Sequence, residues 1–308
     1  MAVGVRGPAA PGRSRAPRRV ERGGRERTKN MQLAKAHGLG NDFLLVPRRG
    51  APDDLAAVTR RLCERHVGVG ADGVIFYEAD GLRASMRLFN ADGGEAEISG
   101  NGLRCLSAYL VSSGAVPPVH VVTTAAGEKA VTVETLEDSR FRVVTDLGAP
   151  ILESDRIPVA LTPPRSPVVG HTLDLDGRRL TLTLTSMGNP HCAMFYDEPV
   201  SDETLRSLGA ALERHALFPN RTNVEFITVV SRREIRVRFW ERGVGYTRAS
   251  GTGAASAAVA SILNGRTDRD VRVVCDGGVL EVSWPEGGIL RQTGEVELLF
   301  IGEWRAAL

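Results

Sequence analysis

The chain has 308 residues, which is enough for two domains that each bury a core. Charged residues make up 25% of it and hydrophobic residues 42%, as is typical of a soluble globular protein. The chain has 39 Lys and Arg residues and 37 Asp and Glu residues. The first 30 residues contain nine of the basic residues and two of the acidic ones, so the rest of the chain has a net charge of −5. That remainder lacks the basic face that nucleic-acid binding requires, and no segment reaches the length of a membrane span. We therefore expect no nucleic-acid partner and no membrane partner.

The first 30 residues are rich in Arg, Gly, Pro and Ala and show no apolar periodicity, which predicts a disordered tail over residues 1–30. They lack the apolar core of a secretory signal, and Ser is too scarce for a typical transit peptide. A start codon assigned upstream of Met31 is the alternative explanation. Four cysteines follow, with no CxxC pair and with separations that fit neither a zinc site nor a disulfide framework. Reduced thiols of this kind favour a cytoplasmic location.

From Met31 onward, the sequence predicts short strands and few helices. Apolar residues at Leu55, Val58 and Leu62 have helical spacing, and Leu103 begins a second stripe of the same kind. The elements predicted for the first half are strands at 44–46, 74–77, 86–89, 119–122, 130–134 and 141–144, and helices at 53–66 and 101–113.

Four prolines between Pro158 and Pro167 mark the crossing into a second half that repeats the pattern. Its predicted elements are strands at 181–185, 223–230, 234–240, 271–274, 280–284 and 296–301, and helices at 202–214 and 252–263. The last of these helices is small and apolar on all sides, so we expect it to be closely enclosed. The fold class expected is α/β (α+β), with two pseudo-symmetric domains in which a curved, barrel-like sheet surrounds a central helix.

We expect the first domain to cover 31–150, joined by a C-terminal strand at 290–308, and the second to cover 151–289. Two nearly identical segments lie 151 positions apart at matching points of these halves: one begins at Ser99 and reads SGNG, the other begins at Ser250 and reads SGTG. Each is followed by a helical run, and a helix start offers unpaired N–H groups and a partial positive charge to an anion. Either segment alone is best explained as an ordinary Ser N-cap. Together they favour one carboxylate held from both sides.

Several polar residues fall at strand ends beside these helix starts. Four are asparagines, and any one of them alone is best explained as an Asx turn. Glu241 and Arg242 could form a plain surface ion pair, and His191 could simply satisfy a backbone carbonyl. These explanations do not account for the presence of so many amide side chains beside two helix starts. The asparagines are Asn41, Asn90, Asn189 and Asn223.

The chain resembles the diaminopimelate epimerase family. The segments that carry the resemblance are, in the family's order, HGLGNDF, RHVGVGADGVIF, FNADGGEAE, SGNGLRC, GNPHC, RTNVEF, WERGVG and SGTGA. They span Met31 to about Trp304, which is essentially the whole chain after the tail.

The resemblance implies an isomerase of lysine biosynthesis that interconverts LL- and meso-diaminopimelate by two-base proton transfer, with no cofactor and no metal. It implies that the substrate's proximal carboxylate sits on the backbone of Gly100, Asn101, Gly251 and Thr252. It implies further that five side chains hold the distal amino-acid end and that Glu241 and His191 flank the acid/base pair. Those five are Asn41, Asn90, Asn189, Asn223 and Arg242. Diaminopimelate is then the small-molecule partner, and a second copy of the chain is a candidate partner in a homodimer.

The chain departs from the family at the two acid/base positions, where the family has cysteines and this sequence has Ser99 and Ser250. A thiol has a pKa of about 8.5 and an aliphatic alcohol one of roughly 15, so the gap is about 8 kcal/mol, or some six powers of ten in base population. His191 could serve Ser99 as an activating base, and Glu241 could serve Ser250. Tyr246 is a further departure, because Glu usually follows Gly-Val-Gly in the family.

Two alternatives to a weakened epimerase therefore remain. One is a catalytically silent relative that binds an amino acid as a sensor or partner. The other is a different isomerase or a dehydratase on the same scaffold, with Ser99 as a one-sided base helper. Absence of hydrogen exchange at the α-carbon of diaminopimelate would eliminate the epimerase and, for that substrate, the other isomerase or dehydratase, and would leave the silent relative.

Overall fold

The structure is a computed structural model and describes residues 30–305. The tail predicted over residues 1–30 lies outside the described residues, apart from Asn30. The helices of the described part are α1 (Leu55–Cys63), α2 (Gly100–Ser112), α3 (Asp202–Glu213) and α4 (Gly251–Leu263). None of the helices within this range is long and apolar enough to cross a membrane.

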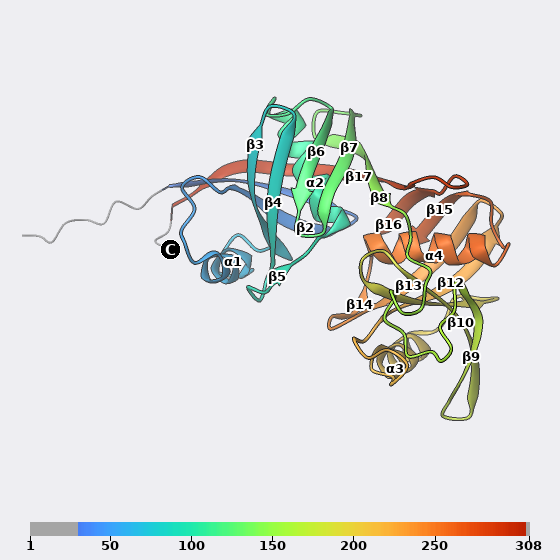
Figure 1. Cartoon of the computed structure of the whole chain (residues 1–308). Helices are drawn as coiled ribbons and strands as arrows, with labels where there is room; N and C mark the ends of the chain where they lie inside the picture. Colours follow the sequence, from blue (N-terminus) through green and yellow to red (C-terminus); the bar gives the residue numbers. More distant parts are fainter. Residues whose placement is uncertain (1–29, 306–308) are drawn as a thin grey trace, which may run out of the picture.

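The first half forms a closed barrel of eight strands around α2 (Figure 1). Its strands pair in the ring order β1 (Met31–Gly38), β2 (Asn41–Pro47), β3 (Gly73–Asp80), β4 (Arg83–Asn90), β6 (Val119–Thr124), β7 (Gly127–Thr135), β8 (Arg140–Gly148) and β17 (Leu290–Trp304), and β17 pairs with β1 to close it. The short β5 (Glu95–Ala96) pairs with β4 beside the ring. A closed ring leaves no unpaired strand edge.

The second half repeats this order as a curved sheet against α4. Its strands are β9 (Val168–Leu175), β10 (Arg178–Ser186), β11 (Pro190–Tyr196), β12 (Asn223–Ser231), β13 (Glu234–Glu241), β14 (Gly245–Thr247), β15 (Asp270–Cys275) and β16 (Gly278–Ser283). Each half contains two parallel strand pairs, β2 with β3 and β4 with β6 in the first, β11 with β12 and β13 with β15 in the second. A parallel pair needs a crossover connection, and each crossover carries one helix. The two halves therefore have the same chain path.

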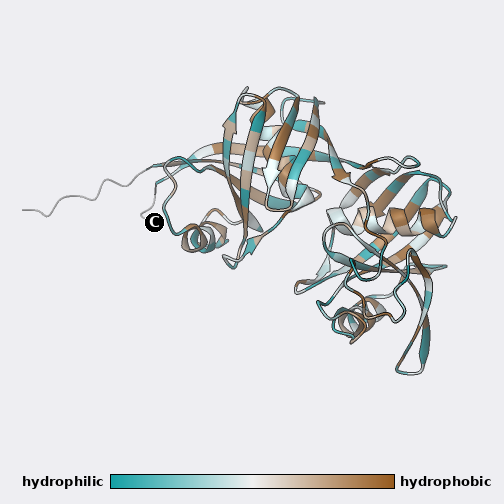
Figure 2. Cartoon of the chain, in the orientation of Figure 1, coloured by the Kyte–Doolittle hydropathy of each residue, from teal (hydrophilic) through white to brown (hydrophobic). Residues whose placement is uncertain are grey.

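The two central helices bury apolar side chains of different size. In α2, large side chains at Leu103, Leu106 and Leu110 are fully buried in the barrel core. In α4, alanines fill most buried positions, so the surrounding strands approach more closely. Figure 2 shows α4 as an apolar helix lying on its sheet. The enclosure expected for this helix is confirmed.

The second glycine of each repeated segment is required by close packing. A Cβ added at Gly102 would lie 2.9 Å from Ile75 Cδ1, and one at Gly253 would lie 2.9 Å from Phe239 Cδ1. The two helices therefore begin against a large apolar side chain of the neighbouring sheet, and each first turn is held in place by it.

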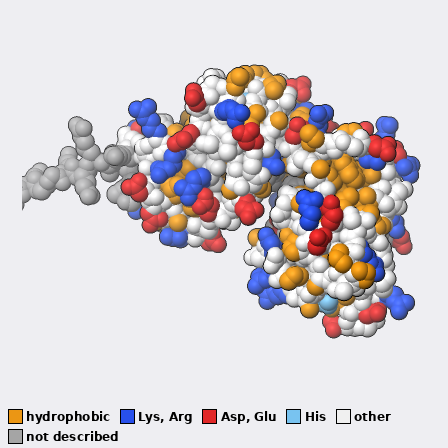
Figure 3. Space-filling model, viewed as in Figure 1, with side chains coloured by type: hydrophobic (Ala, Val, Ile, Leu, Met, Phe, Trp, Pro, Cys, Tyr) orange, Lys and Arg blue, Asp and Glu red, His pale blue; other side chains and the backbone are white. Residues whose placement is uncertain are grey.

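Strand β17 connects the halves. Its first residues pair with β16 of the second half on one side and with β8 of the first half on the other, and its later residues pair with β1 of the first half. Leu39, in the turn between β1 and β2, packs against the apolar core of the second half. Its side chain lies so close to Gly278 that a Cβ added there would be 2.7 Å from Leu39 Cδ2. Seen from the side of Figure 1, the surface is indented between the two halves (Figure 3). The division of the chain at residue 150 stays a prediction.

Candidate active site

The two central helices begin next to each other, although they come from different halves. A Cβ added at Gly251 would lie 3.4 Å from Gly100 Cα, and one at Gly100 would lie 3.5 Å from Gly251 Cα. Because consecutive Cα atoms are about 3.8 Å apart, the Cα atoms of Ser99 and Ser250 lie within about 13 Å of each other. The structure thus brings together the two segments that the sequence singles out.

Both serines cap their helices. Ser99 Oγ accepts a hydrogen bond from Gly102 N at 3.1 Å, and Ser250 Oγ accepts one from Gly253 N at 3.2 Å. Each cap satisfies one N–H of the first turn and leaves the others free to meet an anion. Ser99 is half-buried and Ser250 is buried.

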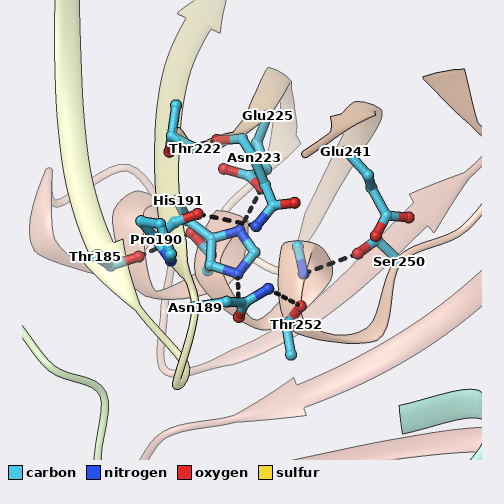
Figure 4. Close-up of polar contacts among 12 residues, drawn as sticks. Thr185, Asn189, Pro190, His191, Thr222, Asn223, Glu225, Glu241, Ser250 and Thr252 are labelled. Atoms are coloured by element: carbon cyan, nitrogen blue, oxygen red, sulfur yellow. Dashed lines mark hydrogen bonds and ion pairs between the residues drawn. The ribbon is translucent and has the colours of Figure 1, made fainter. Parts of the chain in front are cut away.

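Glu241, at the end of β13, lies beside Ser250 (Figure 4). Its Oε1 accepts a hydrogen bond of 2.5 Å from Thr247 Oγ1, and the Ser250 hydroxyl lies close enough to the carboxylate to lower its pKa. Burial raises the pKa of Glu241 above its usual value, although the Thr247 bond, the charge of His191 and the Ser250 hydroxyl oppose the rise. A carboxylate with a raised pKa next to a hydroxyl can accept that hydroxyl's proton.

His191, the second residue of β11, is fully buried and bonded through both ring nitrogens (Figure 4). Its Nδ1 lies 2.6 Å from Glu225 Oε1, and its Nε2 lies 3.0 Å from Asn189 Oδ1. Burial raises the pKa of Glu225, and the charge and hydrogen bond of His191 oppose the rise. Within residues 30–305, neither ring nitrogen contacts Ser99, so the pairing of His191 with Ser99 that the sequence suggests is not seen in this arrangement.

Two of the predicted asparagines organise the same region. Asn189 donates to Thr252 Oγ1 at 3.4 Å, which joins the turn before β11 to the first turn of α4. Asn223 is buried, donates to Pro190 O at 2.9 Å and accepts from Arg242 N at 2.9 Å. The amide of Asn223 therefore holds two neighbouring turns at the site, and its polar atoms are satisfied.

On the side of the first half, Asn41 and Asn101 meet across the start of α2. Asn101 donates to Asn41 Oδ1 at 3.2 Å, and Asn41 donates to Asp72 Oδ2 at 2.8 Å. Asn101 is buried. This chain of amides connects the first turn of α2 to the loop before β3.

The remaining predicted side chains lie at the edge of this region. Asn90 is exposed at the end of β4, and its backbone N–H donates to Gly94 O at 2.9 Å. Arg242 is exposed and donates to Asn220 O at 3.2 Å. Tyr246 points to the β15–β16 turn, where its hydroxyl donates to Asp276 Oδ2 at 2.9 Å.

Sequence reasoning missed a buried polar bridge beneath the two helix starts. Arg104, on α2, donates to Asn101 Oδ1 and, at 2.8 Å, to Gln292 Oε1, while Gln292 donates to Gly251 O at 2.7 Å. Two features of the sequence could have indicated this bridge: Arg104 is a charged residue inside the apolar run of 101–113, and Gln292 is a polar residue inside a strand. Glu225 was also missed as a partner of His191, although it interrupts the apolar run of β12.

Among residues 30–305, no group of three or more His, Cys, Asp or Glu side chains is placed to hold a metal ion. What the region offers is two helix N-termini, the hydroxyls of Ser99 and Ser250, the carboxyl groups of Glu241 and Glu225, and the histidine bonded to Glu225.

Comparison with known proteins identifies the family. The family model described as diaminopimelate epimerase matches residues 33–152 and 183–299. The chain belongs to the diaminopimelate epimerase family. Relatives named diaminopimelate epimerase include one from Desulfitobacterium hafniense, 43% identical over 88% of this chain and 97% of the relative, and one from Desulforudis audaxviator, 45% identical over 89% and 99%. The chain is therefore an epimerase-type isomerase, and the resemblance stated from its motifs is confirmed.

Solved structures confirm the fold class. A predicted epimerase from Pseudomonas aeruginosa matches with a TM-score of 0.64 at 20% identity and covers 90% of this chain and 99% of its own. A hydroxyproline epimerase from Agrobacterium vitis matches with a TM-score of 0.62 at 15% identity, covering 89% and 91%. At these identities the likeness concerns the fold alone.

Proposed function

We propose that this chain interconverts LL- and meso-diaminopimelate by proton transfer on opposite faces of the α-carbon, with Ser99 and Ser250 as the two proton carriers. The observation that carries the proposal is the approach of Gly100 and Gly251, because it sets a capping hydroxyl on each side of one anion-binding point. The names of the relatives support diaminopimelate as the substrate.

In this proposal the proximal carboxylate lies on the free N–H groups of both first turns, Gly100 and Asn101 on α2 and Gly251 and Thr252 on α4. Two helix starts give two partial positive charges, each of about half an elementary charge. Fixed donors aimed at a carboxylate stabilise it more strongly as it gains charge during proton removal. The paired helix starts therefore lower the barrier as well as bind.

The proton moves as follows. Ser250 Oγ takes the α-proton as its own hydroxyl proton passes to Glu241, and the electron pair of the broken C–H bond is held by the carboxylate. Ser99 Oγ–H then gives its proton to the other face of the α-carbon, which forms the new C–H bond. Solvent restores both groups, and the reverse sequence converts the other isomer. The contact of Glu241 with Ser250 supports this assignment, whereas Ser99 has no comparable base among its described contacts.

We assign the distal end of the substrate to five side chains around the helix starts. Asn189 and Asn223 hold adjacent turns there through their hydrogen bonds, and Asn41 reaches the same region through Asn101. Asn90 and Arg242, which are exposed, would contact the substrate from the rim.

The decisive test is hydrogen exchange. LL- and meso-diaminopimelate are incubated separately with the protein at high concentration in D₂O, and loss of the α-proton signal is followed by NMR. We expect slow exchange in both isomers, because each face has a proton carrier. Absence of exchange above a protein-free control would rule out the proposed reaction.

The serines should limit the rate. Changing both Ser99→Cys and Ser250→Cys should raise exchange by several powers of ten, since a thiol ionises about six units lower than an alcohol. A matched control is Ser112→Cys, at the far end of α2, which should leave exchange unchanged. If the double variant folds and gains nothing, the hydroxyls are not the proton carriers.

A second candidate is a silent amino-acid-binding relative. The observation in its favour is that both ring nitrogens of His191 are already bonded, so that Ser99 is left without a base. Calorimetry with meso-diaminopimelate and the exchange experiment together separate the two candidates, because an epimerase binds the ligand and exchanges its α-hydrogen, whereas a silent relative binds the ligand and exchanges none.

A second copy of the chain is the further partner that we propose. Three consecutive apolar side chains of β17, Leu299, Phe300 and Ile301, are exposed, and such a run is typical of an interface. Changing Phe300→Glu should shift the protein from dimer to monomer in sedimentation; an unchanged mass would refute this interface.

We also propose a cytoplasmic location, supported by four free cysteines, and no nucleic-acid partner.

A further inference from the structure

Arg104 is a buried cation without a carboxylate. It is fully buried on α2, and within the described range 30–305 the titratable groups that act on it are the thiols of Cys105 and Cys275, whose pKa values burial raises, and not carboxylates. Its Nε has no hydrogen-bond partner. Burying a guanidinium without a counter-charge is costly, so its position calls for a function.

The guanidinium is fixed by two amide oxygens. It donates to Asn101 Oδ1 in its own helix and to Gln292 Oε1 on β17, and Gln292 in turn holds Gly251 O. Gly294 makes room for it, because a Cβ there would lie 2.9 Å from Arg104 Nε. One side chain is thus hydrogen-bonded to the first turn of α2 directly and to that of α4 through Gln292.

The cation also lies close to the point where the helices meet. Arg104 Nη1 would be 3.6 Å from a Cβ at Gly100, and Gly100 itself contacts Gly251. Burial lowers the pKa of Arg104 to about 10, so the group stays charged at neutral pH. Two helix N-termini and one guanidinium therefore place positive charge close together, and the hydrogen bonds of the guanidinium within the described residues go to amide oxygens and not to a carboxylate.

We propose that Arg104 is a positioning residue that supplies the fixed positive charge balanced by the substrate carboxylate, acting through Asn101 and Gln292. This inference rests on the proposed function. Negative charge grows on the carboxylate as the α-proton leaves, so a fixed cation favours the transition state over the bound substrate. Removing the charge of Arg104 should therefore lower the exchange rate beyond what weaker binding alone explains.

The test compares Arg104→Met, which keeps the length of the stem without its charge, with Arg104→Lys, which keeps the charge. Arg140→Met is the control, since Arg140 lies on β8 in exposed pairs with Glu137 and Glu295. Calorimetry gives the dissociation constant of meso-diaminopimelate, and exchange in D₂O is measured in the background of Ser99→Cys with Ser250→Cys.

We expect Arg104→Met to weaken binding roughly tenfold or more and to lower exchange by a further factor of about ten. Arg104→Lys should recover most of the binding, and Arg140→Met should match the parent. If Lys is as harmful as Met, the side chain acts through its hydrogen bonds alone and the proposal is overturned. If the parent protein binds the ligand and Arg104→Met binds it equally, only this inference fails; if the parent does not bind, the proposed function fails with it.

Should Arg104→Met not fold, Gln292 provides the same comparison. Gln292→Glu sets a neutralising carboxylate against the guanidinium, whereas Gln292→Leu removes the same bond to Gly251 and leaves the charge. We expect Gln292→Glu to bind meso-diaminopimelate at least tenfold more weakly than Gln292→Leu. Equal affinities would overturn the proposal.

Discussion

Glu241 is the residue whose protonation state the proposed reaction depends on. Burial raises its pKa, so it remains a neutral acid to a higher pH than an exposed glutamate and cannot then take the Ser250 proton. Exchange should therefore rise with pH through this raised pKa. Glu241→Gln should lower the rate by about a hundredfold or more and remove that limb of the pH profile. Glu128→Gln, at an exposed position, is the control; a limb that persists in Glu241→Gln would assign it to another group.

Asp42 should contribute to stability at neutral pH. Burial favours its neutral form, but hydrogen bonds and charge from Lys35 and Arg65 outweigh this, and its pKa falls below the ordinary 3.8. A carboxyl with a lowered folded-state pKa stabilises the protein above pH 3.8, and this contribution is lost as the pH falls through the folded-state value.

Asp42→Asn should therefore reduce the free energy of unfolding at pH 7 by roughly 1–3 kcal/mol, because Lys35 and Arg65 lose their partner. The loss should shrink as the pH approaches 3. Urea unfolding followed by circular dichroism measures both effects, with the exposed Asp138→Asn as a reference. A loss that is constant with pH would show that the charge of Asp42 is not its source.

The sequence located the serines, glycines and asparagines of the candidate site, because each has a recognisable local pattern at a helix start or a strand end. It did not locate Arg104 and Gln292, whose contact joins residues 188 positions apart in the chain. Nor did it show that His191 would be held by Glu225 and Asn189. These contacts depend on which strands pair with each other, and the local sequence around a residue does not show that pairing.

At the scale of elements, all four helices were predicted, the two of the first half from apolar spacing, and the structure has them close to the predicted ranges. The strands β1, β5, β9, β11 and β14 were not predicted. In β1, apolar and polar residues alternate only over the short run MQLAKAHG. β11 begins at Pro190, the last residue of a Gly-Asn-Pro segment that is typical of a turn. Short strands receive most of their stability from partners that the local sequence does not reveal.

The Ala-rich face of α4 should tolerate no increase in volume. Ala258 is fully buried within a helix that is enclosed along most of its length. Ala258→Leu should lower the free energy of unfolding by about 1–3 kcal/mol, because extra methylene groups force neighbouring side chains out of their preferred rotamers. Arg206→Leu, on the exposed face of α3, should change it by no more than about 0.5 kcal/mol. Equal effects of the two changes in chemical denaturation would contradict the close packing of α4.

At the scale of the molecule, the repeated chain path was predictable from the repeated Ser-Gly-x-Gly segments. The sequence also indicated a C-terminal strand at 290–308 that joins the first half, although its apolar pattern marked only 296–301. The structure has β17 over Leu290–Trp304, where it closes the first barrel by pairing with β8 and β1. Its first residues pair with both β8 and β16, so that one strand belongs to the sheets of both halves.

This arrangement predicts that the two halves unfold together. Thr293 pairs with Val144 of β8 and with Glu281 of β16, so Thr293→Pro removes a donor at a point where both sheets meet. We expect a single calorimetric transition in the parent protein, and in Thr293→Pro a transition that is lower by several degrees and split into two. The control is Thr172→Pro on β9, which among the described strands pairs only with β10, and which should lower the midpoint without splitting it. Two transitions in the parent protein would mean that β17 does not couple the halves.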